Sequence, residues 1–362
     1  MNVWNPRTII RAVCLLAILA GTTLLAPAAS AAPPSSPHQA VLLDVRKIWD
    51  AGRHNAFPDL IRWHDRWWCT FREAEAHVGG DGLIRVITSE HGEDWESAAL
   101  VAEKDIDLRD PKFSVTPDDR LMIVCGGSVY LGTKQLKGRQ PRVMFSRDGR
   151  SWTTPQRVLS EGDWLWRVTW LGRKAYGVSY KASGSAKTSL PGPAPVQSSP
   201  DWPLTLFCSD DGLKWDFVSV LEVPDRPNET TLRFLPNGDL MAMVRREAGN
   251  AVGWIGTAPP PCWQWTWRES NHRFGGPNFI QLPDGSLIAG TRDYRGLPKT
   301  STLIARLAAD KLLPLLTLPS GGDNSYPGLV WQADTLWVSY YSSHEGKTSI
   351  YLARVKLPGR PQ

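Results

Sequence analysis

Several signatures of common function classes are missing from this 362-residue chain. It has only five cysteines, and none of them has the close spacing of zinc ligands. It also has no glycine-rich phosphate-binding loop and no Ser-His-Asp order typical of a hydrolase triad. The sequence therefore predicts neither a metal site nor a cofactor.

Long hydrophobic runs are also missing. The longest apolar stretch, Ala12–Ala26, is shorter than the roughly 20 residues of a membrane-spanning helix. It follows Arg7 and Arg11 and leads to Ala29-Ser30-Ala31, a pattern typical of a signal peptide with a small-residue cleavage site. We predict that residues 1–31 are a signal peptide, and that the mature protein is secreted to an extracytoplasmic location without a membrane anchor.

Strong charge of either sign is absent from the mature chain. Removal of the leader takes away two arginines and no acidic residue, so the formal charge falls from +5 to +3. This value is too low to indicate nucleic-acid binding. The four cysteines that remain are widely spaced, mostly in apolar runs, and we expect them to be unpaired: Cys69, Cys125, Cys208 and Cys262.

A short apolar segment is present in six copies. The copies end 47 to 65 residues apart, a spacing that suits four short strands with their turns: Trp67–Arg72, Leu121–Gly126, Ala175–Tyr180, Leu240–Arg245, Leu287–Arg292 and Leu336–Tyr341. The longest interval contains a Ser/Pro/Gly-rich stretch, Lys181–Trp202, which indicates an inserted surface loop. The repeats predict an all-β fold, a single six-bladed β-propeller of four-stranded antiparallel blades over residues 38–358. The strand-like run Ala40–Trp49 is expected to complete the last blade.

A second repeated pattern supports the propeller. Ser146–Trp152 and Ser209–Trp215 both read S-x-D-G-x-x-W, and Ser89–Trp95 has His91 in the Asp position. This spacing resembles the Asp-box (BNR repeat) of sialidases. The resemblance implies a turn between the two outer strands of a blade, so we interpret Asp148 and Asp211 as structural residues.

The geometry of a propeller blade indicates which residues can reach a site at the central channel. The start of an inner strand and the end of the second strand lie beside each other at the same rim of the central channel. The residues at inner-strand starts are Asp59, Asp110, Arg167, Glu229, Asn278 and Tyr326, and those at second-strand ends are Arg72, Gly126, Tyr180, Arg245, Arg292 and Tyr341.

Three arginines occupy one repeat position: Arg72, Arg245 and Arg292. Clustered guanidinium groups require acidic neighbours or an anionic ligand, and planar recognition of a carboxylate is their natural use. The alternative is that each arginine pairs with a local acid and only stiffens its blade. Arg167 and Asn278 are further candidates for substrate binding.

Three segments of the later blades resemble sialidases. Asn228–Arg245 is similar to the sialidase blade in which a glutamate precedes an arginine of the carboxylate-binding triad, and Leu282–Arg292 is similar to the blade that follows it. Gly322–Val330 is similar to the segment with the nucleophilic tyrosine. The resemblance implies that Tyr326 is the nucleophile and Glu229 its general base, in a neuraminidase-like glycoside hydrolase.

The first blade departs from that pattern. Ala56 stands where sialidases have an arginine, so Arg72 or Arg53 would have to substitute for it. The acid/base aspartate of sialidases lies in a loop that here reads Glu73–Asp81, where both His77 and Asp81 are candidates. Asp110 is a third candidate, and His344 at the rim is either a substrate contact or part of a turn.

The sequence thus favours a secreted, retaining exo-glycosidase that removes terminal sialic acid or a related acidic sugar from a glycan or glycoconjugate. Two alternatives remain open: a non-catalytic glycan-binding propeller, and a glycosidase for a different sugar on the same scaffold. A propeller closed by its own termini needs no partner, so we expect a monomer.

Overall fold

The computed structural model describes residues 39–79, 82–132, 135–181 and 202–359. The predicted signal peptide, Asp81 and most of the predicted surface loop lie outside these residues. Within them every regular element is a strand, and no helix is long and apolar enough to cross a membrane. The cysteines at positions 69, 125, 208 and 262 are free thiols.

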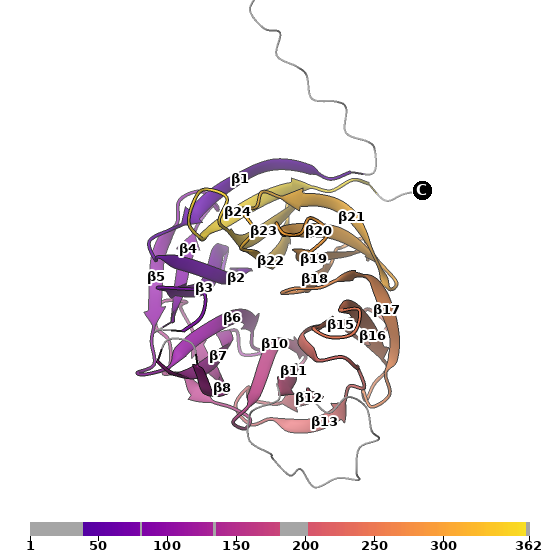
Figure 1. Cartoon of the computed structure of the whole chain (residues 1–362). Coiled ribbons are helices and arrows are strands. Elements are labelled where there is room, and N and C mark those ends of the chain that lie inside the picture. Colours follow the sequence, from indigo (N-terminus) through magenta and orange to yellow (C-terminus); the bar gives the residue numbers. More distant parts are fainter. Residues whose placement is uncertain (1–38, 80–81, 133–134, 182–201, 360–362) are drawn as a thin grey trace, which may run out of the picture. The chain divides into compact units, whose positions relative to one another are not determined.

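Six antiparallel sheets of four strands surround one centre (Figure 1), which confirms the predicted propeller. The inner strands are β2 (His54–Trp63), β6 (Asp107–Val115), β10 (Asp163–Leu171), β14 (Pro227–Phe234), β18 (Asn278–Gln281) and β22 (Asn324–Gln332). The second strands are β3 (Arg66–Ala74), β7 (Leu121–Leu131), β11 (Lys174–Lys181), β15 (Leu240–Arg246), β19 (Leu287–Asp293) and β23 (Thr335–Ser342). All six apolar repeat segments form these second strands.

The outer half of each blade consists of two further strands. The third strands are β4 (Leu83–Ser89), β8 (Gln135–Ser146), β12 (Leu204–Ser209), β16 (Val252–Ala258), β20 (Ser301–Ala308) and β24 (Ser349–Lys356). The outermost strands are β5 (Glu96–Val101), β9 (Gln156–Arg157), β13 (Asp216–Val220), β17 (Thr266–Arg273), β21 (Lys311–Leu318) and β1 (Val41–Trp49).

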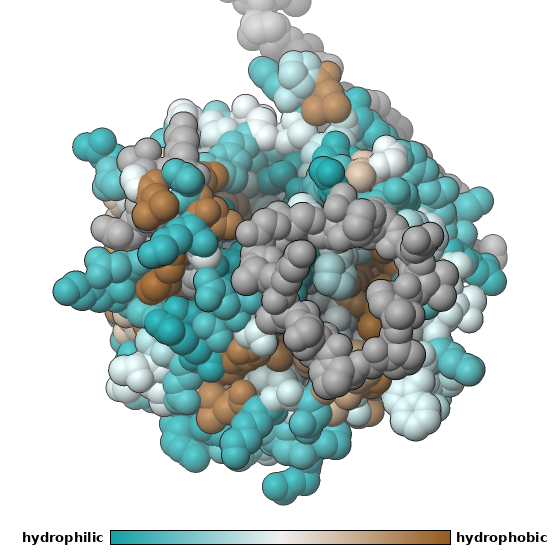
Figure 2. All heavy atoms as spheres, turned by 60° about the horizontal axis from the view of Figure 1, so that its bottom comes forward, coloured by the Kyte–Doolittle hydropathy of each residue, from teal (hydrophilic) through white to brown (hydrophobic). Residues whose placement is uncertain are grey.

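The hydrophobic core lies between blades. In one of its clusters, Val178 and Leu206 of the third blade pack against Leu232, Ala242 and Val244 of the fourth. The second strands are the most apolar because both of their faces are covered by a neighbouring blade. Figure 2 shows one face of the molecule, on which hydrophilic side chains separate small apolar groups.

The S-x-D-G-x-x-W turns connect the third and fourth strands and contact the neighbouring blade. Asp148 accepts hydrogen bonds from the backbone N–H groups of Arg150 and Ser151 at 2.8 and 2.7 Å. Gly149 has a φ of 70°, and a Cβ there would lie 2.2 Å from the ring of Trp68 in the first blade. The glycine is therefore needed for both the turn and the close approach.

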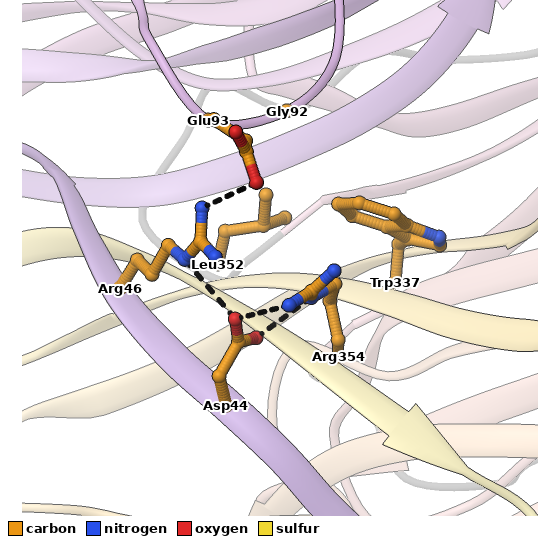
Figure 3. A pocket seen from close by; sticks show the side chains of 7 residues that line it. All are labelled: Asp44, Arg46, Gly92, Glu93, Trp337, Leu352 and Arg354. Atoms are coloured by element: carbon orange, nitrogen blue, oxygen red, sulfur yellow. Dashed lines mark hydrogen bonds and ion pairs between the residues drawn. The ribbon is translucent and has the colours of Figure 1, made fainter.

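The N-terminal strand closes the ring. β1 pairs with β24 as the outermost strand of the last blade, as predicted. Figure 3 shows the small hollow beside this closure, where β1, β23, β24 and a turn of the first blade meet; it is lined by Asp44, Arg46, Gly92, Glu93, Trp337, Leu352 and Arg354. Arg354 donates to Asp44 at 2.9 and 2.6 Å, and Arg46 forms an ion pair with Glu93 at 3.2 Å. The Asp44–Arg354 pair joins β1 to β24 within the last blade, and the Arg46–Glu93 pair connects that blade to the first.

Replacement of Asp44 by asparagine is expected to lower the free energy of unfolding by about 1 kcal/mol or less, because the pairs are partly solvated. Although burial opposes it, hydrogen bonding by Arg354 lowers the pKa of Asp44. The stabilisation that Asp44 contributes is therefore fully present above the ordinary carboxyl pKa, and it is lost as the pH falls through the lowered pKa of Asp44. Urea unfolding should separate Asp44→Asn from the parent at neutral pH but not in acid. Asp65→Asn, at an exposed position, should match the parent at both pH values.

Candidate active site

The Tyr326 side chain lies where all six blades meet. Its ring is within 5.0 Å of the Phe57 ring and 5.6 Å of the Trp166 ring, measured between centroids. Its other neighbours are Glu229, Arg292 and the ammonium group of Lys112. Because these residues come from the five other blades, Tyr326 marks the centre of the propeller.

A bulge in each of five inner strands directs residues to this centre. In three of these strands, the bulge residue has a positive φ and precedes a proline: Phe57 (62°), Asp110 (54°) and Tyr326 (55°). Gly276 (58°) also precedes a proline, just before β18, the inner strand without a bulge. In the other two blades the bulged residues are Trp166 with Arg167, and Asn228 with Glu229. Positive φ is unfavourable for bulky residues and, where it occurs, is concentrated at functional sites. The repeated x-Pro pairs are the sequence signal for these positions.

Tyr326, Glu229 and Arg245 form one hydrogen-bonded group. The Tyr326 hydroxyl donates to Glu229 Oε1 at 2.6 Å, and Arg245 Nη1 donates to Glu229 Oε2 at 2.7 Å and to the Tyr326 oxygen at 3.3 Å. The backbone N–H of Gly276 also donates to Glu229 Oε2, at 2.8 Å. Tyr326 and Glu229 are only 8% and 6% exposed. The glutamate is thus fixed in contact with the phenol.

The charges in this group shift the pKa values of Glu229 and Tyr326 in opposite directions, as a base and the hydroxyl group it deprotonates require. Burial alone would raise the pKa of Glu229, but the charge of Arg245 and the hydrogen bond from Tyr326 hold it below its ordinary value. Burial and the neighbouring Glu229 charge raise the pKa of Tyr326 well above its ordinary value. The resting state is therefore a neutral phenol that donates to an ionised carboxylate.

Two of the three arginines border this group. Arg245 also pairs with Glu247, which in turn accepts from Arg273 at 2.8 Å. The guanidinium group of Arg292 lies 5.7 Å from the Tyr326 ring centroid. Its Nη2 donates to the Asn324 carbonyl and the Tyr341 hydroxyl, whereas its Nη1 has no hydrogen-bond acceptor among the described residues. Arg292 thus retains a donor for a ligand.

The structure places Arg72 elsewhere. Its side chain is 0% exposed and pairs with Asp107, which is also 0% exposed, at 2.7 Å. Its other nitrogens donate to the carbonyls of Ala76 and Gly79 at 2.7 and 3.3 Å. Asp107 belongs to β6 of the second blade, so the pair connects two blades, and the burial of Arg72 keeps it away from a substrate.

Replacement of Arg72 by methionine is expected to lower the free energy of unfolding by about 3–5 kcal/mol, because it leaves the Asp107 charge buried without its main partner. Chemical denaturation measures this loss. Arg53→Met is the matched control, since the Arg53 side chain is 81% exposed and its ion pair within the described part of the chain is with the exposed Glu75. Equal stability of the two variants would contradict a structural role for Arg72.

Arg167 and Asn278 also have structural contacts. Arg167 donates to Asp59 at 2.8 Å, and both side chains are buried. Asn278 donates to the Pro327 carbonyl and accepts from Arg233, both at 3.0 Å. Asp59 and Asn278 each follow a proline, Pro58 and Pro277, so they lie beyond the position that Tyr326 occupies before Pro327 in its own strand.

The three acid/base candidates differ in their surroundings. Asp110 is 8% exposed, its carboxylate accepts no hydrogen bond from the described residues, and burial raises its pKa despite the nearby charges of Arg109 and Lys112. His77 is half exposed and bonds to Asp323 at 3.3 Å. Asp81 lies outside the described residues. Of the two that are described, Asp110 has the features that an acid requires, a carboxyl group that accepts no hydrogen bond from the described residues and a raised pKa.

His344 lies in the turn after β23. Its Nδ1 is 2.9 Å from the Ser342 hydroxyl, and its ring packs on Tyr351 at 4.3 Å. These are contacts within its own blade.

Three residues near the site were not found by sequence reasoning. The Arg109 guanidinium lies 5.1 Å from the Phe57 ring and donates to the Tyr130 hydroxyl and the His77 carbonyl. Asp323 accepts from the Tyr341 hydroxyl at 2.9 Å and contacts His54 at 3.2 Å. His54 and Asp323 are 269 positions apart, so no local motif signals their proximity.

Comparison with known proteins rests on structure alone. No family model matches the chain, and no match was found among curated proteins. A Dyadobacter fermentans protein of unknown function aligns with a TM-score of 0.73 and 18% identity, over 88% of this chain and 99% of that one. An α-L-arabinofuranosidase from Fusarium graminearum aligns at 0.64 and 14%, over 88% and 98%. A Trypanosoma rangeli sialidase aligns at 0.62 and 10%, over 88% and 58%.

These similarities establish the fold. The chain has the six-bladed propeller architecture shared by sialidases and by arabinanases and arabinofuranosidases, and its named structural neighbours are glycoside hydrolases.

Proposed function

We propose that this protein is a secreted, retaining glycosidase that removes a terminal acidic sugar, with sialic acid as the first candidate. The observation that carries the proposal is the buried 2.6 Å hydrogen bond between Tyr326 and Glu229, with Arg245 and Arg292 beside it.

The tyrosine suits a substrate whose anomeric carbon bears a carboxylate. A carboxylate nucleophile would be repelled by that group, whereas a neutral phenol is not, and tyrosine nucleophiles are the sialidase exception among glycosidases. The Tyr326 oxygen attacks the anomeric carbon as its proton passes to Glu229, and the aglycone leaves with a proton from the acid. Water then cleaves the tyrosyl–sugar bond: the acid, now a base, takes a proton of that water, and the departing Tyr326 oxygen regains its proton from Glu229.

The arginines provide positive charge that would complement the carboxylate of an acidic sugar. Arg245 is neutralised by Glu229 and Glu247, while the hydrogen bonds of Arg292 to described residues are all to neutral acceptors, a carbonyl and a hydroxyl. A substrate carboxylate would therefore gain most from Arg292, with bidentate geometry available to a guanidinium group. Arg109 adds a third positive charge near Tyr326.

We propose Asp110 as the acid. Replacement by asparagine is expected to lower kcat/KM by about 10²–10⁴-fold on natural glycosides with poor leaving groups, and much less on activated aryl glycosides. Parent activity should fall as the pH drops through the lowered pKa of Glu229, and also as it rises through the raised pKa of Asp110. Asp110→Asn should lose this alkaline limb. An unchanged leaving-group dependence would exclude Asp110 and direct attention to His77 or Asp81.

Release of 4-methylumbelliferone from its α-N-acetylneuraminic acid conjugate by the mature protein tests the proposed substrate. Turnover that Tyr326→Phe abolishes would support a tyrosine-dependent sialidase. Absence of turnover by folded protein would contradict the sialic acid assignment.

A glycosidase for a different sugar is the second candidate. It is favoured by Ala56, which is fully buried where sialidases have an arginine, and by the burial of Arg72. A panel that includes α-L-arabinofuranosides separates the two enzymes. Glycan binding without turnover on any member would instead indicate a non-catalytic propeller.

A further inference from the structure

A cluster of His54, His77 and Asp323 lies beside the candidate active site. One potential ligand atom from each residue can be chosen so that all three atoms lie within 4.8 Å of one another. His54 is the first residue of β2, His77 is in the loop after β3, and Asp323 immediately precedes β22. Three separate chain segments thus converge on one point.

We propose that this cluster is a binding site for a divalent transition metal of the zinc class. His54 Nε2 and His77 Nδ1 lie 3.2 and 3.3 Å from the same oxygen, Asp323 Oδ2. Bonds of about 2.0–2.1 Å in a tetrahedral zinc site put neighbouring ligand atoms about 3.3 Å apart. Both separations from Asp323 Oδ2 therefore suit one shared ion, and two imidazoles with one carboxylate are a ligand set that zinc accepts.

The surroundings hold these groups in place. The Tyr341 hydroxyl donates to the other oxygen of Asp323 at 2.9 Å, which orients the carboxylate as outer contacts do in metal sites. The His54 ring is largely buried, and its Nδ1 has no partner among the described residues, so its polar contact is with this cluster alone. The His77 ring packs edge-on against Phe57, with centroids 5.1 Å apart.

One side of the cluster is open. The side chains of His77 and Asp323 are 45% and 37% exposed, which leaves access for a fourth ligand from solvent or substrate. Tyr341 also accepts a hydrogen bond from Arg292 at 2.9 Å, so one hydroxyl group connects the cluster to the candidate active site.

The test is titration of the chelator-treated mature protein with Co²⁺, followed by its visible ligand-field absorption, and competition with Zn²⁺. We expect saturation at one ion per chain. His77→Ala and Asp323→Asn should each weaken binding by about 10–100-fold or more, as loss of a ligand requires. Both residues are partly exposed, and urea unfolding should show that both variants remain folded.

His64→Ala is the matched control. His64 contacts Asp119 at 2.7 Å on the surface, and no third ligand accompanies this pair among the described residues. This variant should bind Co²⁺ as the parent does. Absence of saturable binding in the parent, or binding unaffected by both His77→Ala and Asp323→Asn, would overturn the proposal. Because the absorption needs no turnover, this result is independent of the proposed glycosidase activity.

Discussion

Replacement of Tyr326 by phenylalanine is expected to lower kcat/KM by about 10³-fold or more while the protein remains folded. The change removes the hydroxyl group that is proposed to attack the anomeric carbon and that donates to Glu229, and loss of a nucleophile removes the entire covalent route. Glu229 keeps its hydrogen bonds from Arg245 and the Gly276 N–H, so the site retains most of its contacts. Initial rates on the best substrate of the panel measure the effect.

Tyr340→Phe is the control for loss of a buried hydroxyl group. Tyr340 is 0% exposed in the core between the last two blades, and its hydroxyl has no partner among the described residues. Activity of this variant should equal that of the parent. Comparable activity of Tyr326→Phe and Tyr340→Phe would exclude a nucleophilic tyrosine.

Replacement of Glu229 by glutamine is the second change with a large expected effect, a fall in kcat of about 10²–10⁴-fold. An amide cannot accept the phenol proton, and it removes the negative charge that the two nearest donors, Tyr326 and Arg245, both contact. The acidic limb of the pH profile should disappear with the carboxyl group, because that limb reports protonation of Glu229. The pH dependence of kcat/KM in the parent and the variant measures this.

Glu247→Gln separates base catalysis from neutralisation of Arg245. Glu247 pairs with the same arginine but has no contact with Tyr326 among the described interactions. Its loss should reduce kcat at least about tenfold less than the loss of Glu229. Equal losses would mean that Glu229 acts only as a counter-ion.

The fold could be predicted because each blade repeats its apolar second strand. That strand is covered on both faces, so its apolar character is required in every copy, as in Leu121–Gly126 and Leu336–Tyr341. Closure by β1 was predictable because a propeller must seal its last blade, and Ala40–Trp49 was the remaining strand-like run.

The site could be predicted only in part, because bulges change which side chains reach the centre. Glu229 and Tyr326 are bulge residues and lie at the centre, whereas Asn278 begins an inner strand without a bulge and lies among buried partners. Each extra residue in a strand reverses which of the following side chains face the centre. Counting positions from the neighbouring turns therefore does not identify the residues that reach it. The repeated x-Pro pair, as in Asp110-Pro111 and Tyr326-Pro327, would have fixed the alignment of the blades.

The identity of a charged residue also does not reveal its partner. Arg72 and Arg245 occupy the same repeat position, yet Arg72 is buried against Asp107 and Arg245 contacts Glu229 and Tyr326. Asp107 belongs to the next blade, so only the packing of blades assigns Arg72 to a structural pair.

The most direct test of a tyrosine nucleophile is to trap the covalent intermediate. The mature protein is incubated with a 2,3-difluoro derivative of sialic acid, or with the corresponding fluorinated form of whichever sugar the panel identifies, and its peptides are examined by mass spectrometry. We predict one sugar adduct per chain, on Tyr326, and none in Tyr326→Phe. An adduct on a different residue, or turnover of the substrate without any adduct on Tyr326, would contradict the proposed mechanism.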